Sequence, residues 1–257
     1  MRFQPLVARL AFAALGLAVL TGGAAVLGVR QGLLPDASAS ALMIPATALA
    51  VLALVLALLW ARSALITNQG AGKRLGLLAL VGAAAFLYPP LSYVYSGLTS
   101  LPIHDVSTDT EDPPQFVALA KIHPANSRIF DGARHIPYKG EDVTIAYALH
   151  DKYLLLTKPH AGLSNDGQSL PDKIYPRALK AVQQLGWTII EANDKDLRIE
   201  ATDKSFWFWR ISDIVVRLRP AGTMGSRVDI RSESREAGND HGRNIARLKA
   251  FFAHFKL

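Results

Sequence analysis

Residues 10–29 read LAFAALGLAVLTGGAAVLGV, and residues 41–61 read ALMIPATALAVLALVLALLWA. Neither stretch contains a charged side chain. A helix of about 20 residues is roughly 30 Å long, which matches the hydrocarbon core of a lipid bilayer. The sequence therefore predicts two transmembrane helices, over about residues 8–29 and 41–61.

A third uncharged stretch covers residues 75–103, but a Pro-Pro pair at 89–90 interrupts it. The part before the prolines is about 21 Å long as a helix, which is too short to cross a membrane. We expect the helix to continue through the prolines and to span about residues 75–98; the alternative is a re-entrant segment that turns back. The crossing is favoured because it gives an aromatic belt at the membrane surface, formed by Tyr88, Tyr93 and Tyr95.

The basic residues near these spans predict the orientation, because Lys and Arg collect on the cytoplasmic side. Five lie on one side of the predicted helices, namely Arg2, Arg9, Arg62, Lys73 and Arg74. Arg30 lies on the other side, and residues 104–114 contain four carboxylates and no Lys or Arg. We therefore expect a bacterial inner-membrane protein with a cytoplasmic N-terminus. It consists of a transmembrane domain (1–103), an acidic linker (104–114) and a periplasmic domain (115–257).

The net charge of +7, from 28 basic and 21 acidic residues, at first suggests a nucleic-acid partner. Residues 104–257, however, hold 22 basic and 20 acidic residues, a net charge of only +2. The excess lies in the membrane part, so we expect no nucleic-acid partner. The absence of cysteine excludes thiolate nucleophiles and metal sites built on thiolates.

The C-terminal part has the pattern of a two-layer α+β domain. Apolar spacing predicts a helix that begins at Pro176 and ends near Gly186, and a final helix over 242–255. Strands are predicted at 187–192, 197–202, 206–218 and 227–234, and a β-hairpin is predicted from residues 143–149 and 153–157. The fold class is therefore three transmembrane helices followed by an antiparallel sheet with two helices on one face.

Arginine, serine and acidic residues gather near the end of the chain, and they are the candidate site for an anion: Arg231, Ser232, Ser234, Arg235, Asp240, Asn244 and Arg247. Along strand 227–235 the charged residues alternate onto the face opposite Val228 and Ile230. One interpretation is a structural ladder of ion pairs with Arg217 and Arg219, in which Asp240 caps the last helix. The other is a binding site for a phosphate or a lipid headgroup.

Four consecutive aromatic residues give the candidates for a hydrophobic groove: Phe206, Trp207, Phe208 and Trp209. In a strand they alternate between the two faces, so one pair either lines a groove for an acyl chain or a partner, or packs under the hairpin. No metal site is expected, because His pairs with ligand spacing are absent. There is no nucleophile elbow, P-loop or dinucleotide fingerprint, so we expect neither a catalytic residue nor a cofactor.

Four segments resemble the signature of the family of unknown function numbered 1499: RIEATD at 198–203, DIVVR at 213–217, VDIRSESR at 228–235, and the Gly, Asp, Gly, Asn and Arg residues of 238–247. The resemblance covers about residues 172–255. It implies a domain found in bacterial envelope proteins and plastid relatives, without an established activity. This sequence departs from the family pattern at 208–213, which has one carboxylate in place of paired aspartates, and at 133–168, which resembles an insertion.

These observations lead us to expect a non-enzymatic protein. Its periplasmic domain binds a membrane or periplasmic partner protein, as an accessory subunit of a membrane complex. The alternative is a module that binds membrane lipid or another amphiphile through the arginine site and the aromatic strand. A hydrolase is the third reading.

Overall fold

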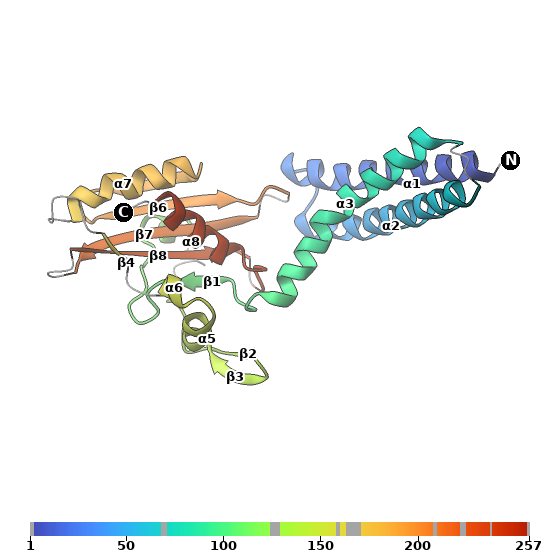
Figure 1. Ribbon diagram of the computed structural model, residues 1–257. Coiled ribbons are helices and arrows are strands. Elements are labelled where there is room, and N and C mark those ends of the chain that lie inside the picture. The colour runs from blue at the N-terminus through green and yellow to red at the C-terminus, as the bar shows by residue number, and fades with distance from the viewer. Residues whose placement is uncertain are drawn as a thin grey trace. The chain divides into compact units, whose positions relative to one another are not determined.

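The computed structural model describes residues 3–67, 71–123, 129–157, 160–162, 171–207, 210–221, 225–236 and 238–255. The chain divides into two compact units, which are shown together in Figure 1. The first comprises the residues up to Tyr95, and the second comprises the residues from Ser96 on, apart from residues 206–209. The two units are described separately.

The first unit is built from three long helices, α1 (Phe3–Arg30), α2 (Asp36–Thr67) and α3 (Lys73–Thr99), and the last turn of α3, from Ser96 on, belongs to the second unit. All three are long and apolar enough to cross a membrane. Helix α3 runs without a break through Pro89 and Pro90, as the sequence predicts. The chain is therefore a membrane protein with three candidate spans.

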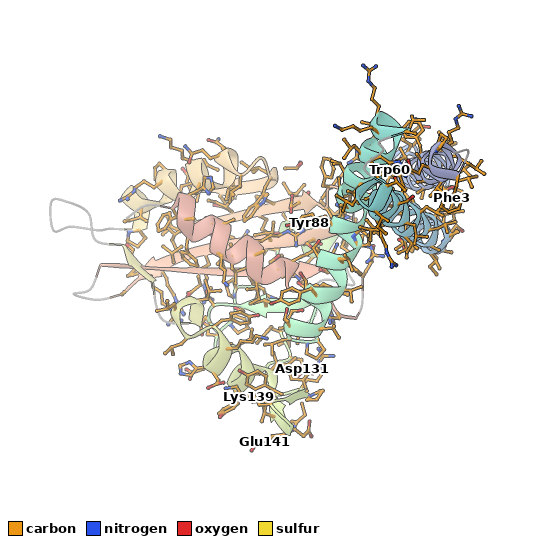
Figure 2. All side chains as sticks on the ribbon, turned by 45° about the vertical axis from the view of Figure 1, so that its right-hand side comes forward. Phe3, Trp60, Tyr88, Asp131, Lys139 and Glu141 are labelled. Atoms are coloured by element: carbon orange, nitrogen blue, oxygen red, sulfur yellow. The ribbon has the colours of Figure 1, made fainter. Side chains whose placement is uncertain are left out.

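Small residues allow these helices to pack closely. Ala11 of α1, Ala57 of α2 and Ala79 of α3 are fully buried and form one cluster. Figure 2 shows Trp60 within this unit, where its indole Nε1 donates a hydrogen bond to the carbonyl of Ala71 at 3.0 Å. A Cβ atom on Gly76 would overlap the Trp60 ring, so glycine is needed there. This is the usual packing of membrane helices, in which small side chains bring the backbones together.

The second unit contains an antiparallel sheet with the strand order β1-β8-β7-β6-β5. Strand β8 pairs with β7 on one side, and on its other side the short strands β1 and β4 pair with opposite ends of it. The strands are β1 (Asp105–Ser107), β4 (His160–Gly162), β5 (Thr188–Asn193), β6 (Arg198–Lys204), β7 (Ile211–Pro220) and β8 (Ser226–Ser234).

Helices α7 (Pro171–Gln184) and α8 (Arg243–His254) cover one face of this sheet (Figure 1). We call this the core face. Ile214, Val216, Val228 and Ile230 point to it, and they form one core with residues of both helices, including Phe251. The prediction of a two-layer α+β domain with both helices on one face is confirmed.

The predicted β-hairpin at 143–157 is wrong. Strand β3 (Glu141–Thr144) pairs with β2 (His135–Tyr138), and the chain then forms helices α5 (Ile145–Lys152) and α6 (Leu154–Thr157). Thr144 ends the strand because its hydroxyl accepts the Tyr147 N–H at 3.2 Å and so caps α5. The buried residues of α5, Ile145, Ala148 and Leu149, have helical spacing. Lys139 and Glu141, in the β2–β3 hairpin, are labelled in Figure 2.

Two boundaries also differ from the sequence predictions. Helix α7 begins at Pro171 rather than Pro176, because Ile174 and Tyr175 are buried against the core and extend the helix by more than one turn. Residues 104–114 are not a free linker. They contain β1, which pairs with β8, and Asp109 and Asp112, which bind arginines of the sheet.

Candidate functional site

The sheet separates the predicted anion-site residues onto its two faces. Arg231 and Arg235 lie on the face opposite α7 and α8, which we call the charged face. The other members lie on or beside the core face: Ser232, Ser234, Asp240, Asn244 and Arg247. The seven residues therefore do not form one cluster, because neighbouring residues of a strand point to opposite sides.

Arg231 is the largest fully buried side chain of the charged face, with 0% of its surface exposed. Its guanidinium donates to both carboxylate oxygens of Asp105, at 3.0 and 2.8 Å, and lies 3.2 Å from Glu233 Oε2. The ring of Phe116 lies 5.0 Å from the guanidinium carbon. A bidentate pair of this kind is geometrically specific, and here it joins β1 to β8.

Three carboxylates lie side by side across the charged face, because Asp105, Glu233 and Asp213 are register partners on β1, β8 and β7. Arg231 binds the first two, and Arg235 binds Asp213 at 2.8 Å. Burial raises the pKa of Asp105 above its ordinary value, although Arg231 acts in the opposite direction. The arginines thus offset a row of buried acidic groups.

A second group on the charged face joins three arginines to the acidic segment. Arg217, Arg219 and Arg227 all pair with Asp229, which is 1% exposed, and with Asp109. The sequence interpretation of an ion-pair ladder that includes Arg217 and Arg219 is confirmed.

Glu200, on β6, attaches a short helix to the same face. It is fully buried, and its carboxylate accepts the backbone N–H groups of Val117, Ala118 and Leu119 at 2.7, 3.1 and 2.7 Å. These groups lie at the start of α4 (Ala118–Ile122). Arg198 Nε lies 2.9 Å from the same carboxylate. The sequence did not indicate this role, because Glu200 and α4 are about 80 residues apart in the chain.

On the core face, Asn244 connects the polar residues. Its side-chain oxygen accepts from Ser232 at 2.8 Å and from Arg247 at 3.0 Å, and its amide donates to Ser234 at 3.1 Å. Arg247 also pairs with Asp203 at 2.6 Å. Ser232, Ser234 and Arg247 therefore all bind Asn244, and these bonds fix α8 to the end of the sheet.

Asp240 caps helix α8, as predicted. Its carboxylate accepts the backbone N–H groups of Gly242 at 2.8 Å and of Asn244 at 2.6 Å. Burial raises its pKa above the ordinary value, and these two N–H groups partly counteract the effect. The side chain is 2% exposed and is used in this cap.

The predicted aromatic strand is partly wrong. Strand β6 ends at Lys204 and β7 begins at Ile211, so Phe206 and Trp207 lie in the turn between them and not on a face of the sheet. They are 70% and 48% exposed, and their rings pack edge to face at 5.0 Å. Phe208 and Trp209 lie outside the described residues.

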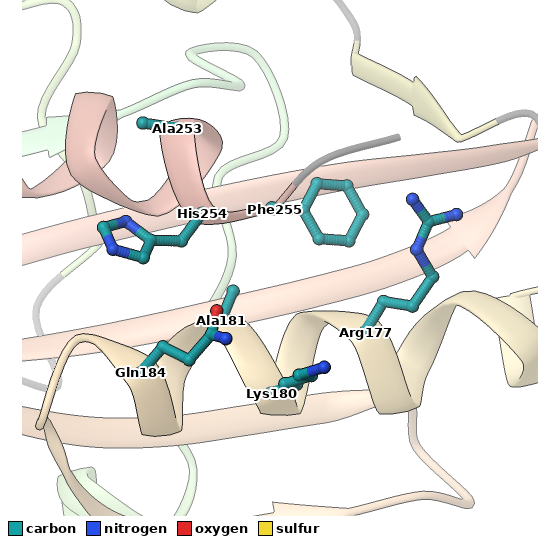
Figure 3. Close-up of a pocket in the computed structure, with 7 residues that line it drawn as sticks. All are labelled: Arg177, Lys180, Ala181, Gln184, Ala253, His254 and Phe255. Atoms are coloured by element: carbon teal, nitrogen blue, oxygen red, sulfur yellow. The ribbon is translucent and has the colours of Figure 1, made fainter.

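A cavity of about 740 Å³ lies between α7 and the end of α8 (Figure 3). Arg177 and Phe255 lie at one end of it, and Gln184 and His254 lie at the other. The Arg177 guanidinium carbon is 5.9 Å from the centroid of the Phe255 ring, and Lys180 adds a second cationic group to the lining. The sequence did not indicate this cavity, since Arg177 and Lys180 resemble any solvated helix face.

The sheet also has an open edge. Within the ranges that the structure describes, no strand pairs with the outer side of β5. Helix α4 lies beside this strand. Three apolar side chains of β5 and of the chain at α4 are exposed, namely Ile190 (38%), Val117 (39%) and Ile122 (56%). An open edge with apolar neighbours is a surface to which another strand can add.

No group of three or more His, Asp or Glu side chains in the described part of the chain has the arrangement of a metal site. The acidic residues of the sheet are instead close to arginine, as the ion pairs above show.

Three apolar helices followed by this α+β domain define the class of the protein, a membrane protein with a mixed α+β domain. The chain belongs to the family described as a protein of unknown function (DUF1499), whose sequence profile matches residues 105–255. The family resemblance predicted for residues 172–255 is confirmed, and the match begins earlier, at the first residue of β1. A search of curated proteins found no match to this chain.

Proposed function

We propose that the chain is a bacterial inner-membrane protein whose α+β domain lies in the periplasm. The proposal is supported by five basic residues, two before the first span and three between the second and third, which this topology places on the same side of the membrane as the N-terminus, and by the acidic segment that follows the third span. A reporter enzyme that is active only in the periplasm, fused after Leu257, should be active. Activity of a cytoplasm-specific reporter at the same position would contradict this orientation.

The domain serves to bind a partner protein, as an accessory subunit of a membrane complex. The observation that carries this proposal is the open edge of β5. An extended segment of the partner adds to β5 through main-chain hydrogen bonds, and its apolar side chains contact Ile190, Val117 and Ile122. The ion pairs of the charged face favour a rigid surface over a flexible one, because they fasten β1 and α4 to the sheet.

Native mass spectrometry of the full chain, purified in detergent from its native host cell, tests this proposal. We expect a second polypeptide in stoichiometric amount with the wild-type chain. Ile190→Lys should lose it, because a charge at a strand edge opposes pairing. The control, Leu155→Lys, alters a residue of α6 that is 77% exposed and should keep the partner. The proposal would be overturned if Ile190→Lys kept the partner, if the wild-type chain carried no partner, or if the measured mass were that of two copies of this chain.

A second candidate function is the binding of an amphiphile with an anionic headgroup, and the cavity between α7 and α8 favours it. Arg177 and Lys180 provide positive charge, and Phe255 and Ala181 provide an apolar wall. The arginines first assigned to an anion site, Arg231 and Arg235, already have carboxylate partners within the domain. A fatty acid added to the purified chain should bind to wild type and bind at least tenfold more weakly to Lys180→Glu. Equal binding to both would refute the cavity as its site.

A further inference from the structure

A second, smaller cavity of about 210 Å³ lies where the third helix ends. Ser96, Thr99 and Ser100 line one side of it. The opposite side consists of Tyr153, just before α6, of the two residues that precede α8, and of residues of α8 that include Lys249. All of these residues belong to the second unit. The cavity therefore adjoins the last turn of a candidate membrane span.

Two lysines share the ring of Tyr153. Lys249 Nζ is 5.3 Å and Lys152 Nζ is 5.8 Å from the ring centroid. Lys152 also donates a hydrogen bond to the carbonyl oxygen of Thr99. In the described part of the chain, neither lysine forms an ion pair with a carboxylate. The nearby acidic group, Asp240, is buried and caps α8.

The distribution of charge strengthens this contrast. The arginines of the sheet are surrounded by carboxylates of the same domain, whereas Lys152 and Lys249 have a phenol ring and a carbonyl as their described contacts. Burial lowers the pKa of Lys152, so its environment disfavours the charged form in the absence of an anion. An anion bound beside both ammonium groups would reverse this effect.

The position of the cluster relative to the lipid follows from α3. Tyr88, Tyr93 and Tyr95 are 73%, 43% and 68% exposed, and aromatic residues at the end of a span mark the membrane interface. Thr99, the last residue of α3, lies four residues beyond Tyr95, about 6 Å along the helix. The headgroup layer is about 5–7 Å thick on each side of the hydrocarbon core. Residues in contact with Thr99 thus lie at the level of the headgroups.

We propose that Lys152 and Lys249, held beside Tyr153, bind the phosphate of anionic phospholipids at the membrane surface where α3 ends. The ligand is a lipid of the bilayer in which the chain is embedded, so the headgroup reaches the lysines from the side of Ser96 and Thr99. This surface is distinct from the edge of β5 and from the cavity between α7 and α8.

Native mass spectrometry of the full chain, released from micelles with equal amounts of phosphatidylglycerol and phosphatidylcholine, tests the proposal. We expect wild type to retain phosphatidylglycerol preferentially. The double variant Lys152→Gln with Lys249→Gln should lose about 30-fold of this preference, since each lysine near an anionic surface contributes about fivefold. The control, Lys121→Gln with Lys195→Gln, removes two exposed lysines elsewhere and should change it less than twofold.

An equal loss in both double variants, or no loss in either, would overturn the proposal. A second measurement does not depend on the folding of the lysine variants. The chain contains no cysteine, so Ala246→Cys takes a single nitroxide label at an exposed position of the cavity. In phosphatidylglycerol nanodiscs the label should lie within about 10 Å of the phosphate plane. A label in bulk water beyond that distance would refute the placement.

Discussion

The replacement Arg231→Ala examines the charged face most directly. Arg231 is fully buried and holds Asp105 on β1 and Glu233 on β8. Removing one partner of a buried ion pair costs about 3–5 kcal/mol, because the remaining charge stays buried without compensation. In a domain of this size each kcal/mol lowers Tm by about 2–4 °C, so we expect a decrease of about 6–20 °C.

Thermal unfolding of the full chain in detergent, followed by tryptophan fluorescence, measures this change. Arg134→Ala is the control, because it removes an exposed arginine and should change Tm by less than about 2 °C. A double-mutant cycle with Asp105→Asn should give a coupling energy in the range of about 0.5–3 kcal/mol. A decrease below about 3 °C for Arg231→Ala, or a coupling energy near zero, would refute this account of the charged face.

Three further predictions concern other parts of the chain. Glu200→Ala should lower the stability by about 3–5 kcal/mol and, in hydrogen exchange, release residues 117–119 more than the rest of the sheet; uniform protection would contradict this role of Glu200. Burial raises the pKa of Asp240, so its contribution to stability is complete below pH 3.8 and declines as the pH rises through the pKa of the folded chain. Asp240→Asn, compared with wild type by urea unfolding, should therefore gain in relative stability from pH 4 to pH 7, and a relative loss would show that the sign is wrong. Gly76→Leu should separate α3 from Trp60 and expose its indole to quenchers, whereas unchanged quenching would count against close packing at this glycine.

The features that depend on local sequence were predictable. Apolar length alone indicates the three membrane helices, because about 20 uncharged residues match the bilayer. The alternation of apolar and charged residues in β8 likewise indicated its two faces, and the structure places Ile230 and Arg231 on opposite sides. In both cases the sequence pattern that predicts the structure lies within one helix or one strand.

The features that depend on distant contacts were not predictable. Arg231 and Asp105 are 126 residues apart, and neither local sequence indicates that the two side chains form a pair. The acidic stretch at 104–114 has the composition of a linker. It is held to the sheet by ion pairs with arginines that lie about 100 residues later in the chain. The segment at 143–149 alternates between larger and smaller side chains as a strand does. The signal for the helix was Thr144, which caps it, but the alternation favoured the prediction of a strand.

The pairing of β8 with three other strands has a consequence for how the domain folds. Strands β1, β4 and β7 all pair with β8, the last strand to be synthesised. Residues 104–203 contain 11 basic and 15 acidic residues, a charge of −4, and residues 204–257 contain 11 basic and 5 acidic residues, a charge of +6. The nascent domain therefore stays acidic, and β1, β4 and β7 lack their shared partner strand, until its final quarter emerges. We therefore expect the late closure of long loops onto β8 to be its slowest folding step.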